Sequence, residues 1–410
     1  MTLDEAAPPP SGTSRREPWL TRPVAGIGGA SLLADLGHEV PTALLPSFLT
    51  TTLGAPAAAL GLIEGVADGC AGVARVAGGA LADDPERRRR TAVGGYTATA
   101  VLSSLVGVTT AAWQAGVLRA GAWTARGLRV PSRNALLADV VPAHAYGRAY
   151  GFERMMDNLG AVGGPLLALA LVSVVSTRTA ILVSVIPGLL AALAIVYAIH
   201  LTRRPTAQEH RPVRLRIRPV LHDRLGRLFA GISAFELGNV AATLLILRAI
   251  ELLEPEHGQH RAEQLAIGLY VAYNVAAAAS SVPGGRLGDR RSPLLTLGFG
   301  VALFGLAYAG FALGGASIAA LGVCFVAAGI AIGFVETAEH AAVATHAPEE
   351  LRGSAFGALA GIQSLGNFAS SAIAGILWTA VSPRAAFLYL TLWMLLALAA
   401  VAWSRDRSSS

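Results

Sequence analysis

The sequence of 410 residues contains no lysine, because all 32 of its basic side chains are arginines. A Walker-type phosphate loop needs a lysine on the terminal phosphates, and Schiff-base chemistry needs a lysine amine. Both kinds of chemistry are therefore excluded. Only two cysteines occur, Cys70 and Cys324, and each lies in an apolar stretch far from the other. The sequence thus predicts neither a disulfide framework nor a cysteine metal site.

Charged residues are also scarce. They make up 14% of the chain, against about 25% in an ordinary soluble protein. Apolar residues make up 53%, and the 46 glycines are scattered through the apolar runs instead of forming linkers. This composition argues against a soluble globule and is typical of a protein with many membrane-spanning helices.

Apolar segments of membrane-spanning length recur from Trp19 onward, in two sets of six. The first set lies near residues 20–52, 56–82, 90–112, 114–140, 146–175 and 179–201. The second set lies near residues 222–252, 263–287, 292–313, 316–345, 350–380 and 384–404. Each segment can cross about 30 Å of hydrocarbon at about 1.5 Å per residue. We predict an all-α membrane protein with about twelve transmembrane helices in two pseudo-symmetric six-helix bundles.

The same pattern predicts how the chain is divided. We expect six-helix bundles at 19–201 and 222–404, joined by a basic, proline-containing linker at 202–221. Residues 1–18 are polar and proline-rich and lack the apolar core of a signal peptide, so we expect a disordered tail. Residues 405–410 form a second short tail.

Arginines set the expected orientation. With the N-terminus inside, the inner loops and tails carry about 21 arginines and the outer loops about three. We therefore expect a multi-pass protein of the cytoplasmic (inner) membrane with both termini cytoplasmic. The outer sequence EPEHGQHRAE (254–263) is expected to be a solvated loop without a metal. Near the membrane interfaces or helix ends we expect Trp113, Trp123, Trp378 and Trp403, most of them as aromatic anchors.

An internal repeat connects the two sets of helices. GGALADD at 78–84 matches GGRLGDR at 284–290 after a shift of 206 residues, and the same shift places 142–151 on 348–357. Two matches at one offset predict parallel, homologous halves. That arrangement is typical of transporters whose halves rock about a central site near the membrane midplane.

These residues resemble the major facilitator superfamily over about Trp19 to Arg405. GGALADDPERRRR is similar to the family's loop between helices 2 and 3, although Asp84 stands where a basic residue is usual and Glu86 where a glycine is usual. The residues that match this loop and its second copy are Gly79, Leu81, Asp83, Arg87, Arg88, Gly285, Leu287, Asp289 and Arg290. The resemblance implies that this loop clasps the halves together on the inner face near 349–353. A charge cluster that only orients the chain is the alternative.

Two further segments carry the resemblance. Arg119 takes the position of the family's buried arginine on helix 4, and Asp139 lies at the cytoplasmic end of that helix, where Arg87 is expected to pair with it. Gly160, Gly164 and Pro165 are similar to the helix 5 signature of antiporters that export drugs and metabolites. The trailing glycines of that signature are absent, and close helix packing in any membrane bundle also uses this spacing.

Ionisable residues inside the first bundle predict a functional site. Each costs about 2.5 to 3.5 kcal/mol in a spanning helix, so such residues mark pathways or partners. Asp35, His38 and Glu39 share one face of helix 1, because they are three and four residues apart. The expected neighbours on helices 2 and 4 are Glu64, Asp68, Arg119 and Arg126, with Arg133 and Arg129 along the same stripe of helix 4. A carboxyl group there without a full partner could load and release a proton.

The second bundle carries an acidic counterpart. Glu336, Glu339 and His340 are expected to share a face of helix 10, and the repeat places them opposite Val130, Arg133 and Asn134. A structural bridge between the halves is the alternative. The same half also has polar residues within its spanning segments, namely Glu236, Asn274, Gln363 and Asn367.

The sequence therefore favours a secondary transporter of a small organic solute, working by alternating access and exporting its substrate against protons. We expect Asp35, with Glu39 second, to be the coupling acid. The expected partners are the substrate, protons and the lipid bilayer, without nucleic acid, cofactor or obligatory protein partner. An uptake symporter or facilitator is one alternative. A membrane enzyme or sensor is another, but no catalytic constellation is visible in the sequence.

Overall fold

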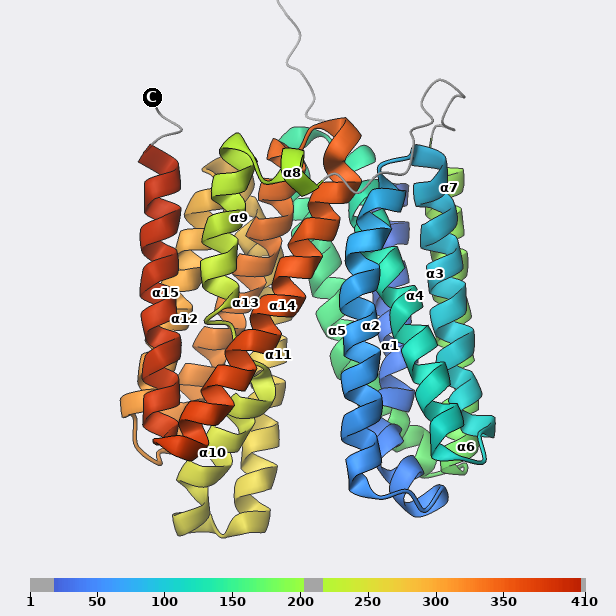
Figure 1. The fold of residues 1–410 in the computed structure, drawn as a ribbon, viewed down its shortest axis with the longest axis vertical. Helices are drawn as coiled ribbons and strands as arrows, with labels where there is room; N and C mark the ends of the chain where they lie inside the picture. The colour runs from blue at the N-terminus through green and yellow to red at the C-terminus, as the bar shows by residue number, and fades with distance from the viewer. Residues whose placement is uncertain (1–17, 203–216, 407–410) are drawn as a thin grey trace, which may run out of the picture.

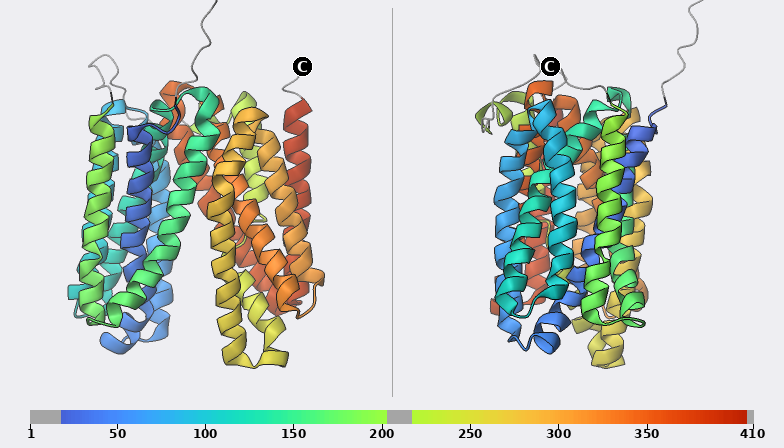
Figure 2. Two further views of the ribbon diagram at one scale, coloured as in Figure 1. Left: turned by 180° about the vertical axis from the view of Figure 1, so that it is seen from behind. Right: turned by 90° about the vertical axis from the view of Figure 1, so that its right-hand side faces the viewer.

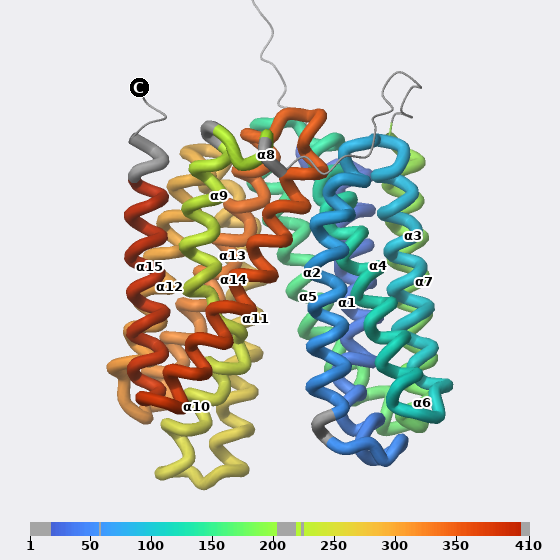
Figure 3. Tube along the Cα trace, in the orientation of Figure 1, coloured from blue at the N-terminus to red at the C-terminus, as the bar shows by residue number. Residues whose placement is uncertain are grey.

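The computed structural model describes residues 18–202 and 217–406, and all regular secondary structure within these ranges is helical. Figures 1 and 3 show two groups of long helices standing side by side, the first blue to green and the second yellow-green to red. One end of the molecule, at the top of Figure 1, holds the C-terminal ends of α7 (Val185–His200) and α15 (Pro383–Asp406). The short helix α8 (Ile217–Val220) lies at the same end.

The N-terminal half contains six spanning segments. Five are single helices and the sixth is the pair α6 and α7, bent at Ser184. Their bounds are α1 (Arg22–Ser47), α2 (Ala57–Ala82), α3 (Pro85–Leu105), α4 (Ala112–Asp139), α5 (Tyr146–Val172) and α6 (Thr177–Val183) with α7. Short turns extend some of these helices, namely η1 (Phe48–Thr52), η2 (Val106–Val108) and η3 (Ala143–Ala145).

The C-terminal half repeats this plan. Its first segment is the broken pair α9 and α10, and five single helices follow. The bounds are α9 (Asp223–Glu236), α10 (Ala242–His257), α11 (Gln259–Arg290), α12 (Pro293–Leu313), α13 (Ile318–His346), α14 (Arg352–Ala380) and α15, with the turn η5 (Glu349–Leu351) before α14. The predicted all-α fold of two six-helix bundles is confirmed.

Seven of these segments are long and apolar enough to cross a membrane by length and composition alone. The helices α1, α2, α4 and α14 are of similar length, but they contain more polar, charged and small residues than the criterion allows. The pair α9 and α10 is divided into pieces of 14 and 16 residues, so neither piece qualifies by itself. Helices that carry polar groups in the bundle interior are those that a hydropathy criterion misses.

Three predicted boundaries are corrected. The segment predicted as one helix at 222–252 is broken between Glu236 and Ala242, where Gly238 lies directly against α15. The predicted outer loop at 254–263 is helical on both sides of Gly258, whose φ of 73° makes the sharp turn between α10 and α11. A left-handed conformation of this kind favours glycine.

The third correction concerns the start of α3, which begins at Pro85 instead of near residue 90. The side chain of Asp84 caps this helix, accepting hydrogen bonds from the backbone N–H groups of Glu86 at 3.1 Å and Arg87 at 2.8 Å. Aspartate before a first-turn proline is a strong helix start. The departure at Asp84 from the expected loop pattern therefore has a structural role.

Small residues join the halves at one end, and they follow the repeat. A side chain on Gly79 of α2 would collide with Gly353 and Gly357 of α14, and one on Gly285 of α11 would collide with Gly147 of α5. Gly285 lies 206 residues after Gly79, and Gly353 lies 206 residues after Gly147. The repeat therefore relates the two contacts to each other. Two equivalent close crossings therefore hold the halves together, and the helices diverge toward the other end (Figures 1 and 2).

Candidate functional site

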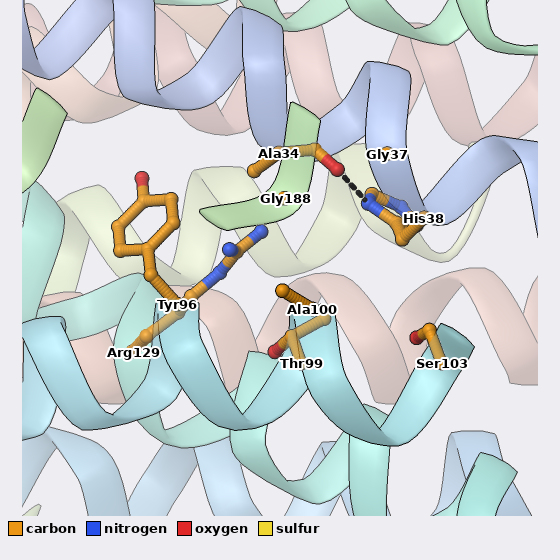
Figure 4. Close-up of a pocket in the computed structure, with 9 residues that line it drawn as sticks. All are labelled: Ala34, Gly37, His38, Tyr96, Thr99, Ala100, Ser103, Arg129 and Gly188. Atoms are coloured by element: carbon orange, nitrogen blue, oxygen red, sulfur yellow. Dashed lines mark hydrogen bonds between the residues drawn. The ribbon is translucent and has the colours of Figure 1, made fainter. Parts of the chain in front are cut away.

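His38 lies between two carboxyl groups on α1. Its Nδ1 is 3.3 Å from Asp35 Oδ1, and its Nε2 is 3.3 Å from Glu39 Oε1. Nδ1 is also 2.8 Å from the backbone oxygen of Ala34, the contact drawn in Figure 4. Because a backbone oxygen can only accept, Nδ1 must carry a hydrogen. Nε2 and the Glu39 oxygen would then face each other with lone pairs unless a proton lies between them.

Two glycines of α5 position this group. A side chain on Gly160 would meet Asp35 Cβ at 2.8 Å and Leu32 O at 2.6 Å, and one on Gly164 would collide with the side chain of Glu39. The helices α1 and α5 therefore approach closely behind both acids. The sequence predicted close packing from this glycine spacing, and the structure assigns it to α1.

Arg126 and Arg119 of α4 reach toward these acids. Arg126 Nη2 is 3.7 Å from Asp35 Oδ1, a loose contact that leaves this oxygen without a hydrogen bond among the described residues. Arg119 is held more firmly, since it contacts Glu64 Oε1 at 3.0 Å and donates to Thr42 Oγ1 at 3.0 Å. The expected ties between helix 4 and the acids of helices 1 and 2 are present.

Trp123 fills the space between the two arginines. The Arg119 guanidinium lies 3.4 Å from the centroid of the Trp123 ring. The indole N–H of Trp123 donates to Asp68 Oδ1 at 3.0 Å. The ring of His38 meets it edge-on at 5.5 Å. Trp123 is therefore a buried member of the site, and its expected role as an interface anchor is wrong.

Glu64 and Asp68 of α2 contact α4 through Arg119 and Trp123. They lie on one helical stripe with Gly72, Arg75 and Gly79, and the last three residues contact α14. Glu64 is partly exposed and Asp68 is exposed. Because the halves diverge along this stripe, these two acids lie on the surface where the halves face each other.

A second ionic network connects α4 and α5. Arg133 Nη1 is 2.6 Å from Glu153 Oε1 and 3.3 Å from Asp157 Oδ1, and Arg154 contacts the same two acids at 2.7 and 3.2 Å. Ser31 adds a 2.7 Å hydrogen bond to Glu153. Every charge in this network has an opposite neighbour, which is the arrangement of a buried structural ion-pair network.

Arg129 differs from the other arginines of α4. Its side chain is buried, makes no hydrogen bond or ion pair with the residues that the structure describes, and lies 4.0 Å from the ring centroid of Tyr96. It lines a cavity of about 10 Å³, with the residues drawn in Figure 4. Tyr96 Oη and Ser103 Oγ also lack partners there. The cavity is about large enough for one water, which would satisfy these groups.

The expected acidic face of α13 is divided among three neighbourhoods. Glu336 Oε2 is 3.9 Å from Arg154 Nη1, so it belongs with the network on α5. Glu339 accepts a 2.8 Å hydrogen bond from Gln363 of α14. The ring of His340 stacks on Phe356 at 6.0 Å and is 5.7 Å from Tyr150. These three residues therefore do not form one site.

The predicted gating loop does bridge the halves. Asp83 Oδ1 accepts a 2.8 Å hydrogen bond from the backbone N–H of Ser354, and its other oxygen accepts from the Ser354 hydroxyl. Asp139 pairs with Arg88 and also with Arg352 Nη1 at 3.2 Å. The prediction that Arg87 pairs with Asp139 is wrong. Arg87 is exposed, and the buried Arg88 pairs with Asp139 instead.

The second copy of the loop makes the equivalent bridge. Asp289 accepts from the backbone N–H groups of Gly147 at 2.7 Å and Arg148 at 3.1 Å, and it pairs with Arg148 Nε at 2.7 Å. Arg148 and Ser354 are 206 residues apart, as are Asp83 and Asp289. Arg290 is exposed at the end of α11.

Arg75 is a bridging residue that the sequence analysis missed. Its guanidinium donates to Ser364 Oγ of α14. A signal was present in the sequence, since Arg75 lies four residues before Gly79 and seven after Asp68, on one helical face with both. No group of three or more His, Cys, Asp and Glu in the described ranges is arranged to hold a metal ion.

Comparison with known proteins identifies the family of this chain. The family model of the Major Facilitator Superfamily matches residues 27–250 and 257–410. An uncharacterized MFS-type transporter of Methanocaldococcus jannaschii is 28% identical over 375 residues, which is 90% of this chain and 92% of that protein. A multi-drug resistance efflux pump PmrA homolog of Lactococcus lactis subsp. cremoris is 37% identical over 68 residues, which is 17% of this chain and 57% of that protein.

Solved structures share the fold. A bacterial homologue of the iron transporter ferroportin, in an outward-facing state, has a TM-score of 0.72 at 16% identity, and the match covers 94% of this chain and 100% of that one. The alternative of a membrane enzyme or sensor is overturned by the family match. The chain therefore belongs to the major facilitator superfamily, and it is a multi-pass membrane transporter rather than an enzyme.

Proposed function

We propose that this transporter exports a small organic compound in exchange for protons, and that the coupling site is the group Asp35, His38 and Glu39 on α1. The observation that carries the proposal is the position of His38, 3.3 Å from a carboxylate oxygen on either side. Such a group can bind a proton between Nε2 and Glu39 and release it when the surroundings change.

The surroundings can change because Asp35 is held loosely. The distance from Arg126 Nη2 to Asp35 Oδ1 is 3.7 Å, whereas the distance from Arg119 Nη2 to Glu64 Oε1 is 3.0 Å. A cationic or polar group of a substrate at Asp35 would displace Arg126 or a proton. Reciprocal linkage then requires that proton binding weaken substrate binding by the same factor, which is the basis of exchange.

Export is supported by the contacts of α5. Gly160 and Gly164, which resemble the signature of exporters, pack directly against Asp35 and Glu39. The similarity over 68 residues to a protein named as a multi-drug resistance efflux pump homolog supports the same direction. Glu64 and Asp68, with Trp123 beside them, would add an acidic and aromatic surface for the substrate.

The orientation is part of the proposal. The arginine count favours a cytoplasmic position for the loop between α2 and α3, for both termini and for the linker at 202–221, in an inner membrane. The bundle boundaries at 19–201 and 222–404 belong to the same proposal. With this orientation, the end at which the halves are joined is the inner face, and the conformation is open to the outside.

Proton movement in proteoliposomes tests the function. Purified protein is reconstituted with a pH-sensitive dye inside, and a panel of small organic cations, anions and zwitterions is added outside. If the wild-type protein is an exchanger, entry of a transported compound into the vesicles should be accompanied by movement of protons out of them. Asp35→Asn and Glu39→Gln should lose this proton movement and keep exchange of labelled for unlabelled compound.

A variant of an exposed pair serves as control. Glu86→Gln changes a carboxyl group whose partner Arg90 is exposed, so it should behave like the wild type. Movement of protons in the same direction as the compound would identify an uptake symporter and contradict export. Unchanged proton movement in both α1 variants would place the coupling acid elsewhere, with Glu336 or Glu339 as the next candidates.

A further inference from the structure

Two carboxyl side chains lie fully inside the C-terminal half. Glu236, the last residue of α9, is 3% exposed, and Glu339 in the middle of α13 is 0% exposed. An ionised carboxylate in such a place needs a cation, because the desolvation cost amounts to several kcal/mol per ion. Glu153, a buried acid of the N-terminal half, meets this need with two arginines.

Glu236 and Glu339 have amide partners instead. Asn239 Nδ2 donates to Glu236 Oε2 at 3.0 Å, and Gln363 Nε2 donates to Glu339 Oε2 at 2.8 Å. The second oxygen of Glu339, Oε1, is buried and has no hydrogen-bond partner among the described residues. An amide satisfies one lone pair but supplies no charge, and an orphaned oxygen in the interior is costly.

The two acids lie against the same helix, α14. Gln363 donates to Glu339, and three residues further along α14 Gly366 packs against the side chain of Glu236. Among the described residues, the side-chain hydrogen-bond partners of both acids are amides and not arginines. Glu336, three residues before Glu339 on α13, is 3.9 Å from Arg154 Nη1.

Among the described residues, the hydrogen bonds that α12 and α15 make next to the pair come from neutral side chains. The hydroxyl of Tyr308 on α12 lies 3.4 Å from the backbone nitrogen of Val240. Tyr389 on α15 lies 3.5 Å from the oxygen of Leu237. His340, next to Glu339 in sequence, holds Nδ1 2.7 Å from the backbone oxygen of Glu336. On the side of α14, Gln363 and Asn367 are both neutral.

The break between α9 and α10 adds to the effect. Glu236 lies at the C-terminal end of α9, where the helix dipole presents partial negative charge. Asn367 of α14 donates to the backbone oxygen of Asn239 at 3.1 Å, and Gly366 lets α14 approach Glu236 closely. The break thus places an acid against carbonyl groups and a second acid, which disfavours its charge further.

We propose that Glu236 and Glu339 form a proton-binding site of the C-terminal half, separate from the group on α1, in which at least one of the two carboxyl groups carries a proton in the conformation described. The proton is taken from water when the site opens and returned to water on the other side. The use of this proton in transport rests on the proposed function, whereas its presence in the resting protein does not.

Infrared difference spectroscopy on the protein in lipid, without any substrate, tests the proposal. The protonated carboxyl C=O band of the wild type at neutral pH should shift in D₂O, and Glu339→Gln or Glu236→Gln should remove part of it. Glu86→Gln, at an exposed pair, should leave the band unchanged. Glu339→Gln should also unfold near the wild-type temperature, because a neutral amide replaces a neutral acid of the same shape.

Two results would overturn the proposal. An unchanged band in both Glu339→Gln and Glu236→Gln would mean that neither acid is protonated. Loss of the band on replacing choline chloride by sodium chloride at equal ionic strength would mean that a metal cation occupies the pair. Failure of the proposed coupling at α1 is distinguishable, because Asp35→Asn would then retain proton-driven transport without any change in this band.

Discussion

The carboxylate of Asp83 at the end of α2 accepts a 2.8 Å hydrogen bond from the backbone N–H of Ser354 at the start of α14, and so joins the two halves. Its repeat equivalent, Asp289, accepts from the N–H of Arg148 at 3.1 Å. The two carboxylates therefore act as a symmetric pair of clasps at one end of the molecule, each using the positive N-terminal end of a helix in the opposite half.

Asp83→Asn should weaken the first clasp. Hydrogen bonds to a charged acceptor contribute about 1.5 to 3 kcal/mol, so the population open at this end should rise by at least tenfold. The reporter is Ser364→Cys, at the α2–α14 contact, in a Cys70→Ser, Cys324→Ser background. A thiol reagent applied to inverted vesicles should label it faster in Asp83→Asn, whereas Glu86→Gln should not alter the rate. Equal rates in Asp83→Asn and the parent protein would show that the clasp does not gate.

Gly285→Ala should open the same end by a steric route. The added methyl group would collide with the backbone of Gly147 and Arg148, so α11 and α5 could not approach as they do here. The Ser364→Cys reporter should again label faster, without any loss of charge. Gly94→Ala is the matched control, because nothing lies within 4 Å of its added carbon. A labelling rate like that of Gly94→Ala would contradict the prediction.

Arg133→Met should destabilise the N-terminal half. It removes a guanidinium that lies 2.6 Å from Glu153 and leaves a buried carboxylate with one cation fewer. Breaking a buried pair costs about 3 to 5 kcal/mol, so the unfolding temperature of the purified protein should fall clearly. Arg90→Ala, at an exposed pair, should change stability by at most about 0.5 kcal/mol. A Tm for Arg133→Met as high as that of Arg90→Ala would mean that the network contributes little.

Cysteine labels should report opposite sides for the linker and the α10–α11 turn. The linker at 205–215, outside the described residues, is expected on the cytoplasmic side, and 256–260 on the outer side, because of the arginine asymmetry. An impermeant thiol reagent added to intact cells should therefore label Glu256→Cys but no position in the linker. Labelling of both from the same side would contradict the twelve-helix topology.

The sequence by itself determined the spanning segments, their arrangement in two sets of six and the equivalence of the halves. Apolar segments of fixed length and a repeat at one offset are local properties of the chain, and the membrane leaves a backbone little choice except helix. The same local reading found Asp83 and Asp289, because each ends a helix at the same place in the repeat. It also found the common face of Asp35, His38 and Glu39, which follows from helical spacing alone.

Only the tertiary structure decided which partner each charge takes. Successive residues on a helix point about 100° apart, so the capped start of α3 turned Arg88 inward to Asp139 and Arg87 to the outside. The approach of α5 placed glycines behind Asp35 and Glu39, and the break after Glu236 left that acid beside Glu339 without a cation. These results depend on the rotation and contact of whole helices, and the spacing of residues along one helix does not specify them.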